Sequence, residues 1–251
     1  MQRHQYGDDG VVLRTQKLGE ADRIITVLCR QSGRVRAVAK GVRRTKSRLG
    51  ARVEPFTHVD LLLHTGRSLD TISQAEVLRP YGASLAADYP RYTAGIAMLE
   101  TAEKLTPVEK EPSLRQFLLL VGGLRTLTEG EREPRLVLDA YLLRSLAVAG
   151  YAPALEECAR CGTRGSGLTA FAIAAGGMVC HTCRPPGAAM PAAATIALML
   201  ALLRGDWELA ENSERRHRVE CSGLVAAYLQ WHLEHSIRSL RHVERVLVVE
   251  R

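Results

Sequence analysis

The sequence predicts an α+β protein with a small β-barrel at its start, an α-helical domain after it and a metal-binding module inserted in the helical part. Near Pro80 the apolar residues change from the two-residue period of strands to the spacing of helices. Two Cys-X-X-Cys pairs stand in the second half, and a run of basic residues stands in the first. We therefore expect domains at 1–79 and 80–251, with the module at 155–186.

Five short runs rich in Val, Ile, Leu and Thr precede Pro80. Turn signals such as Gly19, Ser32-Gly33 and Thr65-Gly66 separate several of them. Five strands within so short a stretch fit a five-stranded β-barrel of the oligonucleotide/oligosaccharide-binding (OB) type. The predicted strands cover residues 11–16, 23–29, 34–39, 56–64 and 69–77.

After Pro80 the apolar residues recur at helical spacing, and Gly150 is expected to stop the third helix. The apolar stripes of these helices are most simply core, and a partner-binding role for one of them is the alternative. The clearest stripe consists of Leu224, Val225, Tyr228, Leu229 and Leu233. The predicted helices begin at Tyr92 and then cover residues 114–128, 135–149, 191–204 and 219–240.

The two Cys-X-X-Cys pairs are separated by eighteen residues, which predicts one tetrahedral zinc ion. Each pair places two thiolates on one tight turn, and the intervening stretch can fold back as a hairpin with a strand at residues 168–173. Four thiolates close the coordination shell, so we expect the zinc to be structural rather than catalytic. The predicted ligands are Cys158, Cys161, Cys180 and Cys183.

Two disulfides are the rival interpretation of these cysteines, and they would require an oxidising compartment. The N-terminus has no apolar signal region, and no run of eighteen uncharged apolar residues occurs, so we expect reduced thiols in the cytoplasm. His181 could replace one ligand, although four cysteines suffice. Cys29 and Cys221 lack such partners and are expected to be buried small hydrophobic residues.

The net positive charge comes from one segment of the chain. The chain carries 34 Lys and Arg against 27 Asp and Glu, a net charge of +7, and residues 23–53 hold ten basic residues and no acid. Without that segment the count is 24 against 27, or −3. A localised field of this kind suits a polyanion, and an inconsequential solvated charge run is the alternative.

Within the basic segment, one predicted strand separates its charges from its apolar residues. Val35, Ala37 and Ala39 share one parity, so the strand would pack that face and present its bases on the other. Residues 41–52 are interpreted as a mobile basic loop, and the face and loop together predict a groove for phosphates. The predicted nucleic-acid-binding residues are Arg34, Arg36, Lys40, Arg43, Arg44, Lys46, Arg48 and Arg52.

The barrel region contains only two aromatic residues, Tyr6 and Phe56. Proteins that specialise in single strands stack successive bases on aromatic rings, and this barrel offers few. We therefore expect binding through phosphates, with strong salt dependence and little sequence preference.

Motifs for catalysis are missing from the sequence. It has no complete phosphate-binding loop, no His-Glu-X-X-His zinc motif and no Gly-X-Ser-X-Gly elbow, and upstream of Cys158 it has no His-X-Glu pair of the kind that a zinc deaminase uses. This favours a binding protein over an enzyme.

Five segments together resemble a known family. They are GVVLRT at 10–15, GEADRIITV at 19–27, GRVRAVAKGVRR at 33–44, RVEPF at 52–56 and GYAPALEECARCG at 150–162. These segments resemble the RecO family of DNA recombination and repair proteins, most strongly over the first eighty or so residues. The last segment is similar to the start of that family's zinc module.

The resemblance implies a recombination mediator of the RecFOR pathway. Such a protein binds single- and double-stranded DNA, anneals complementary strands and works with RecR and single-stranded-DNA-binding protein so that RecA loads onto gaps. It implies association with the nucleoid and no membrane partner. Only the basic barrel residues and the four cysteines carry over to this chain. Two other classes remain open: an RNA-binding or transcription-associated protein with an OB fold and zinc ribbon, and a zinc hydrolase acting on nucleic acid.

Overall fold

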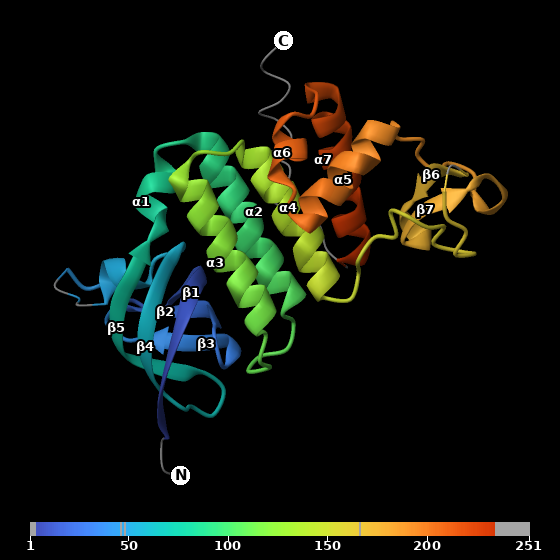
Figure 1. Ribbon diagram of the computed structural model, residues 1–251. Coiled ribbons are helices and arrows are strands. Elements are labelled where there is room, and N and C mark those ends of the chain that lie inside the picture. The colour runs from blue at the N-terminus through green and yellow to red at the C-terminus, as the bar shows by residue number, and fades with distance from the viewer. Residues whose placement is uncertain (1–3, 46, 48, 166, 234–251) are drawn as a thin grey trace. The chain divides into compact units, whose positions relative to one another are not determined.

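The computed structural model describes residues 4–45, 47, 49–165 and 167–233, and it has the predicted α+β fold (Figure 1). Contacts divide the chain into two compact units, residues 1–130 and 131–251. The first unit holds the five-stranded sheet and three helices, and the second holds the remaining helices and the cysteine module. Among the described residues, no helix combines the length and apolar character that a membrane span needs.

The five N-terminal strands form a sheet that closes on itself. Their order is β1-β2-β3-β5-β4, and β1 also pairs with β4. All pairings are antiparallel except the one between β3 and β5, which joins Ala37 to Asp70 and Val38 to Thr71. The strands are β1 (Gln5–Leu18), β2 (Asp22–Cys29), β3 (Gly33–Ala39), β4 (Thr57–His64) and β5 (Asp70–Pro80).

The interior of this sheet is filled by the apolar side chains that stand at alternate positions of its strands. Val35, Ala37 and Ala39 of β3 are fully buried, which confirms the predicted alternation. Cys29 is also fully buried there, as expected for a small hydrophobic residue. A short 3₁₀ helix, η1 (Gly50–Val53), adds Val53 to the same core.

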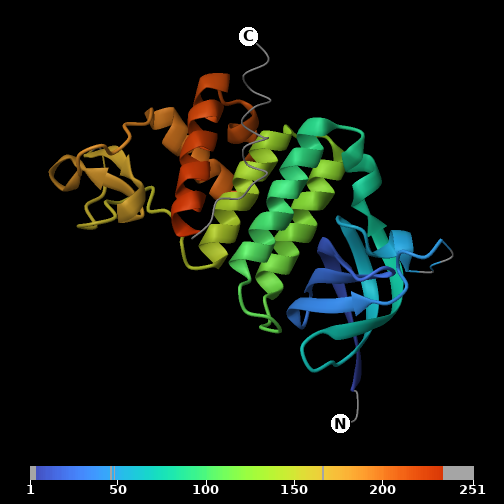
Figure 2. The same ribbon diagram turned by 180° about the vertical axis from the view of Figure 1, so that it is seen from behind.

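Three helices pack against the sheet within the first unit, and Figures 1 and 2 show them beside it. Phe56 has a positive φ of 69° and its ring lies 5.5 Å from that of Tyr92. A Cβ on Gly95 would come within 2.8 Å of the same ring, so glycine allows the close approach. The helices are α1 (Tyr81–Ala86), α2 (Tyr89–Leu105) and α3 (Leu114–Glu129).

The second unit is built on α4 and α7, with α5 packed against both. The predicted stripe of α7 is buried, with Tyr228 at 1% exposure, which confirms its assignment to the core. Gly150 has a φ of 90° directly after α4, in agreement with its predicted role as a helix stop. The helices are α4 (Pro134–Val148), α5 (Ala193–Arg204), α6 (Trp207–Glu211) and α7 (Arg215–His232).

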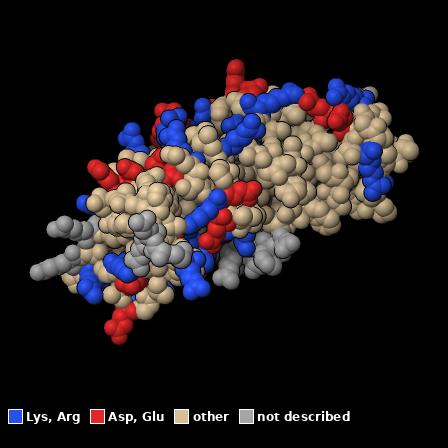
Figure 3. Space-filling view, turned by 90° about the horizontal axis from the view of Figure 1, so that it is seen from below, with Lys and Arg blue, Asp and Glu red and all other residues tan. Residues whose placement is uncertain are grey.

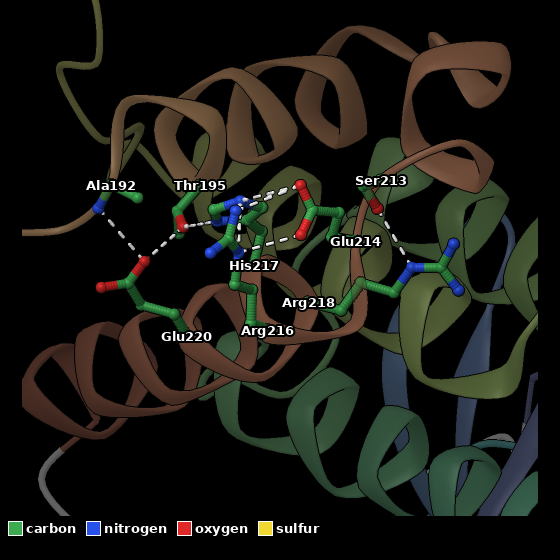
Figure 4. A network of polar contacts seen from close by, with 8 residues as sticks. All are labelled: Ala192, Thr195, Ser213, Glu214, Arg216, His217, Arg218 and Glu220. Carbon is green, nitrogen blue, oxygen red and sulfur yellow. Dashed lines mark hydrogen bonds and ion pairs between the residues drawn. The ribbon is translucent and has the colours of Figure 1, made fainter.

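A side chain from α7 caps the first turn of α5 (Figure 4). The Glu220 carboxylate accepts hydrogen bonds from the backbone N–H of Ala192, at 3.2 Å, and from the Thr195 hydroxyl. His217 Nδ1 lies 3.3 Å from the same hydroxyl oxygen. Because Ala192 has no side chain that could cap the helix, Glu220 supplies the acceptor from another helix.

The cysteine module is a small hairpin of β6 (Leu168–Ala172) and β7 (Gly177–Cys180). Two single 3₁₀ turns, η2 (Ile173–Ala175) and η3 (His181–Cys183), follow the two strands. The ring of Phe171 meets that of Tyr228 edge to face at 5.7 Å, which attaches the hairpin to α7.

The elements differ from the predicted ones mainly at their ends. β1 starts at Gln5 rather than near residue 11, and α1 and α6 were not predicted. The last predicted helix, 219–240, starts earlier, at Arg215, and its residues after 233 lie outside the described part of the chain. The predicted domain division at Pro80 coincides with the end of β5, while α1 to α3 belong to the same compact unit as the sheet.

Candidate metal centre and basic surface

Two tight turns bring the four cysteines of the module together. In the first turn, Cys158 N–H donates to Thr163 O at 2.8 Å, and Gly162 N–H donates back to Cys158 O at 2.8 Å. Gly162 has a φ of 73°, a conformation that favours glycine. The second turn is the end of β7 and η3. Backbone N–H of Ala159 donates to Met178 O at 2.8 Å and links the first turn to β7.

The four sulfur atoms lie within 4.8 Å of one another, and all four thiols are free. Cys161 Sγ and Cys180 Sγ are 3.8 Å apart. Four sulfurs at about 2.3 Å from one tetrahedral zinc ion would be separated by about 3.8 Å. The cluster could therefore hold a metal ion, and the group that forms it does not include His181.

The electrostatics of the cluster favour a cation. The backbone N–H of Cys180, 3.4 Å from Cys158 Sγ, is the main cause that lowers the pKa of Cys158 to about 6. The pKa of Cys183 is instead raised to about 12, chiefly by the neighbouring Cys180 and Cys161 thiols. Without a cation the sulfurs cannot all be thiolates at neutral pH, and a bound metal ion would remove that conflict.

Of the predicted nucleic-acid-binding residues, Lys40, Arg43 and Arg44 gather at the end of β3, and all three are exposed. Arg43 donates to the carbonyls of Gly19, at 3.3 Å, and Glu20, at 2.8 Å. Arg43 is therefore hydrogen-bonded to the β1–β2 turn. Within the described residues, no carboxylate forms an ion pair with these three side chains.

Arg52 is the only other predicted base of the loop that the structure describes, and it lies apart from these three. Arg52 donates to Ala75 O of β5 at 3.0 Å, on a different part of the sheet. Lys46 and Arg48 lie outside the described residues. The turn at residues 41–44 is hydrogen-bonded rather than open, because Gly41 N–H donates to Asp22 Oδ1 at 2.7 Å.

Arg34 and Arg36 of β3 face the connection between α2 and α3. Arg34 donates from Nε to Thr106 O at 2.6 Å and from Nη2 to Pro107 O at 2.5 Å. Arg36 Nε lies 2.6 Å from Glu109 Oε1. These two bases therefore have intramolecular anionic or carbonyl partners that the spacing of charges along the chain did not predict.

The ten basic residues of residues 23–53 are partly balanced by acids from outside that segment. Arg23 pairs with Glu54 at 2.5 Å, and Arg30 lies 4.0 Å from Asp9. On the face drawn in Figure 3, basic and acidic side chains are interspersed and much of the surface carries neither. Among the described residues of this segment, the largest group of basic side chains without an acidic partner is thus the cluster of Lys40, Arg43 and Arg44 at the end of β3.

Phe56 is buried and Tyr6 is partly buried, so the barrel aromatics offer little ring surface on which a base could stack. The Tyr6 hydroxyl donates to Asp70 Oδ2 at 2.5 Å, and Phe56 is 3% exposed against α2. Contacts to nucleic acid through this sheet would have to go to phosphates.

Comparison with known proteins identifies the family. A family model described as recombination protein O, N terminal, matches residues 1–81, and one described as recombination protein O, C terminal, matches residues 86–241. The DNA repair protein RecO of Thermobifida fusca is 69% identical over 240 residues, which cover 96% of this chain and 98% of that protein. The proteins of the same name from Frankia casuarinae and Streptomyces griseus are 62% and 59% identical, over 96% of this chain and 98% and 99% of their own lengths. The chain therefore belongs to the recombination protein O (RecO) family.

Proposed function

We propose that this protein is a recombination mediator in DNA repair. It binds single- and double-stranded DNA, anneals complementary strands and, with RecR and single-stranded-DNA-binding protein, helps RecA to load onto gaps at the nucleoid. Membership of the RecO family supports the assignment to DNA repair. The chemistry of the basic surface supports DNA binding and annealing, and the work with RecR, single-stranded-DNA-binding protein and RecA is proposed from the family resemblance.

The observation that carries the proposal is the exposed cluster of Lys40, Arg43 and Arg44, which has no carboxylate partner among the described residues. Annealing requires two polyanions to approach while their base edges remain free. Side chains that grip phosphates without stacking on bases lower the repulsion and leave pairing unobstructed. The burial of Phe56 and the engagement of the Tyr6 hydroxyl by Asp70 fit this role.

No chemical step by the protein is needed for this activity. Duplex formation itself supplies the free energy, so nucleotide hydrolysis is not required and we propose that the protein is not an enzyme. The four cysteines would hold one structural Zn²⁺, because four thiolates leave no open position at which water could be activated.

The decisive experiment is annealing of complementary DNA strands that are coated with single-stranded-DNA-binding protein. We expect the protein to accelerate annealing equally with and without ATP. Acceleration with RNA strands but not with DNA would instead support an RNA-binding protein, and shortening of the strands would support a hydrolase. No acceleration with either nucleic acid would contradict the proposal.

A further inference from the structure

The connection between α2 and α3 lies along β3 like an additional short strand. Lys110 N–H donates to Arg34 O at 2.9 Å, and Arg34 forms a parallel bridge with Glu109. A Cβ on Gly33 would lie 1.8 Å from the Glu111 carbonyl oxygen, so only glycine permits this approach. The connection is therefore held against the edge of β3 that carries two of the predicted DNA-binding residues.

The two arginines beneath this connection are held very differently. The Arg34 side chain is 12% exposed, donates two hydrogen bonds to carbonyl oxygens and lies 3.9 Å from Glu109 Oε1, so its role is structural and Glu109 is only its distant partner. The Arg36 side chain is 37% exposed, and its carboxylate partner Glu109 is 34% exposed. Arg36 Nε itself is buried close to Glu109, yet it has no aligned hydrogen bond among the described residues. An ion pair of this kind is weak and open to competition.

A carboxylate and a phosphodiester offer the same chemistry to a guanidinium, since both are anionic oxygen acceptors. Glu109 thus occupies the position at which a DNA phosphate would meet Arg36. Glu111 carries the same charge on the same connection, but its side chain is exposed and forms no ion pair with a described basic residue. Glu109 is therefore distinguished by its contact rather than by its charge.

We infer that Glu109 is an internal competitor for DNA, whose carboxylate is displaced from Arg36 when a phosphate binds. The inference rests on the proposed function and deepens it, because it makes Arg36 a contact that DNA gains only by breaking an ion pair. Arg34 remains a structural residue in both states. The α2–α3 connection then lowers the affinity of β3 for DNA without blocking the exposed cluster of Lys40, Arg43 and Arg44.

The test is a mutant cycle on the full-length protein, with binding to labelled single-stranded and duplex DNA measured by fluorescence anisotropy at low salt. Glu109→Gln should tighten binding by about threefold to fivefold. Glu111→Gln removes the same charge from the same connection and should tighten binding much less. In an Arg36→Gln background, Glu109→Gln should give no more gain than Glu111→Gln gives in the wild type.

Equal gains from Glu109→Gln and Glu111→Gln would overturn the inference, because they would show only long-range charge removal. A gain that persists in the Arg36→Gln background would overturn it as well. A lower melting temperature for Glu109→Gln with unchanged DNA affinity would show that Glu109 contributes only to the stability of the fold. If the wild type bound no DNA, the proposed function itself would fail. Failure of the inference alone would instead leave DNA binding intact and change only the differences among the variants.

Discussion

Lys110 extends its ammonium group to within 2.9 Å of the Asp70 carboxylate, which is 1% exposed. Asp70 also accepts hydrogen bonds from the Tyr6 hydroxyl, at 2.5 Å, and from Gly66 N–H, at 3.0 Å. One buried carboxylate thus joins β1, the start of β5 and the α2–α3 connection. One of the contacts that hold the connection over β3 is therefore made by an ionisable group.

Replacing this carboxylate should weaken the first unit at neutral pH. Burial alone would raise the pKa of Asp70, but hydrogen bonds from Tyr6, Gly66 and Lys110 lower it below its ordinary value. A lowered pKa stabilises the folded state above the unfolded-state pKa, and this contribution is lost as pH falls through the folded-state pKa. Asp70→Asn should cost about 1–3 kcal/mol at pH 7 and flatten the acid limb of the curve of melting temperature against pH. Asp60→Asn, at an exposed position of β4, should change the stability by less than about 0.5 kcal/mol.

Asp139 of α4 should give the opposite pH dependence. Burial raises its pKa to about 7, although the hydrogen bond from Ser222 and the charge of Arg135 oppose the shift. Between the unfolded-state pKa and about pH 7 the folded state binds the extra proton, so stability should fall as pH rises by up to about 1.4 kcal/mol per pH unit. Asp139→Asn should reduce this slope. Relative to the wild type, the variant should have a more favourable free energy of unfolding at pH 8 than at pH 5, as measured by urea unfolding. An unchanged slope would show that Asp139 is ionised throughout.

Loss of one cysteine ligand should remove the metal and unfold the module. A structural zinc site contributes an apparent ~10 to 16 kcal/mol, which exceeds the net stability of most domains. Cys161→Ser should therefore lower both the zinc content, measured by mass spectrometry, and the melting temperature. Cys221→Ala, at a buried cysteine outside the cluster, should retain full zinc. A metal-free Cys161→Ser protein with the wild-type melting temperature would contradict a structural metal.

Charge reversal at Arg43 and Arg44 should abolish DNA binding and annealing. If the wild type contacts about six phosphates, its duplex affinity should fall on the order of a thousandfold between ~50 and ~200 mM salt. The matched control reverses Arg115 and Arg125, two exposed arginines on α3. Helicity and zinc content should be normal in both variants. Full annealing by the Arg43→Glu, Arg44→Glu protein would place the DNA site elsewhere, and salt-independent binding would contradict a phosphate-based site.

Features that depend on residues close together along the chain could be predicted from the sequence alone. The parity of Val35, Ala37 and Ala39 predicted the inward face of β3, because successive side chains of a strand alternate between faces wherever it pairs. The two Cys-X-X-Cys turns and the hairpin between them are also local, so their spacing predicted the cluster that the structure shows. Long helices with a regular apolar stripe were predicted for the same reason, whereas the five or six residues of α1 and α6 are too few to show a period.

The balance of the charges and the length of the strands depend instead on contacts between segments that are distant in the sequence. β1 begins at Gln5 because its first half pairs with β4, and that partner lies some fifty residues along the chain. Arg36 appeared unbalanced in the sequence because its acid, Glu109, belongs to another element. An ion pair or a ladder of hydrogen bonds depends on the distance between atoms in space, and local periodicity carries no information about which distant segment will supply the partner.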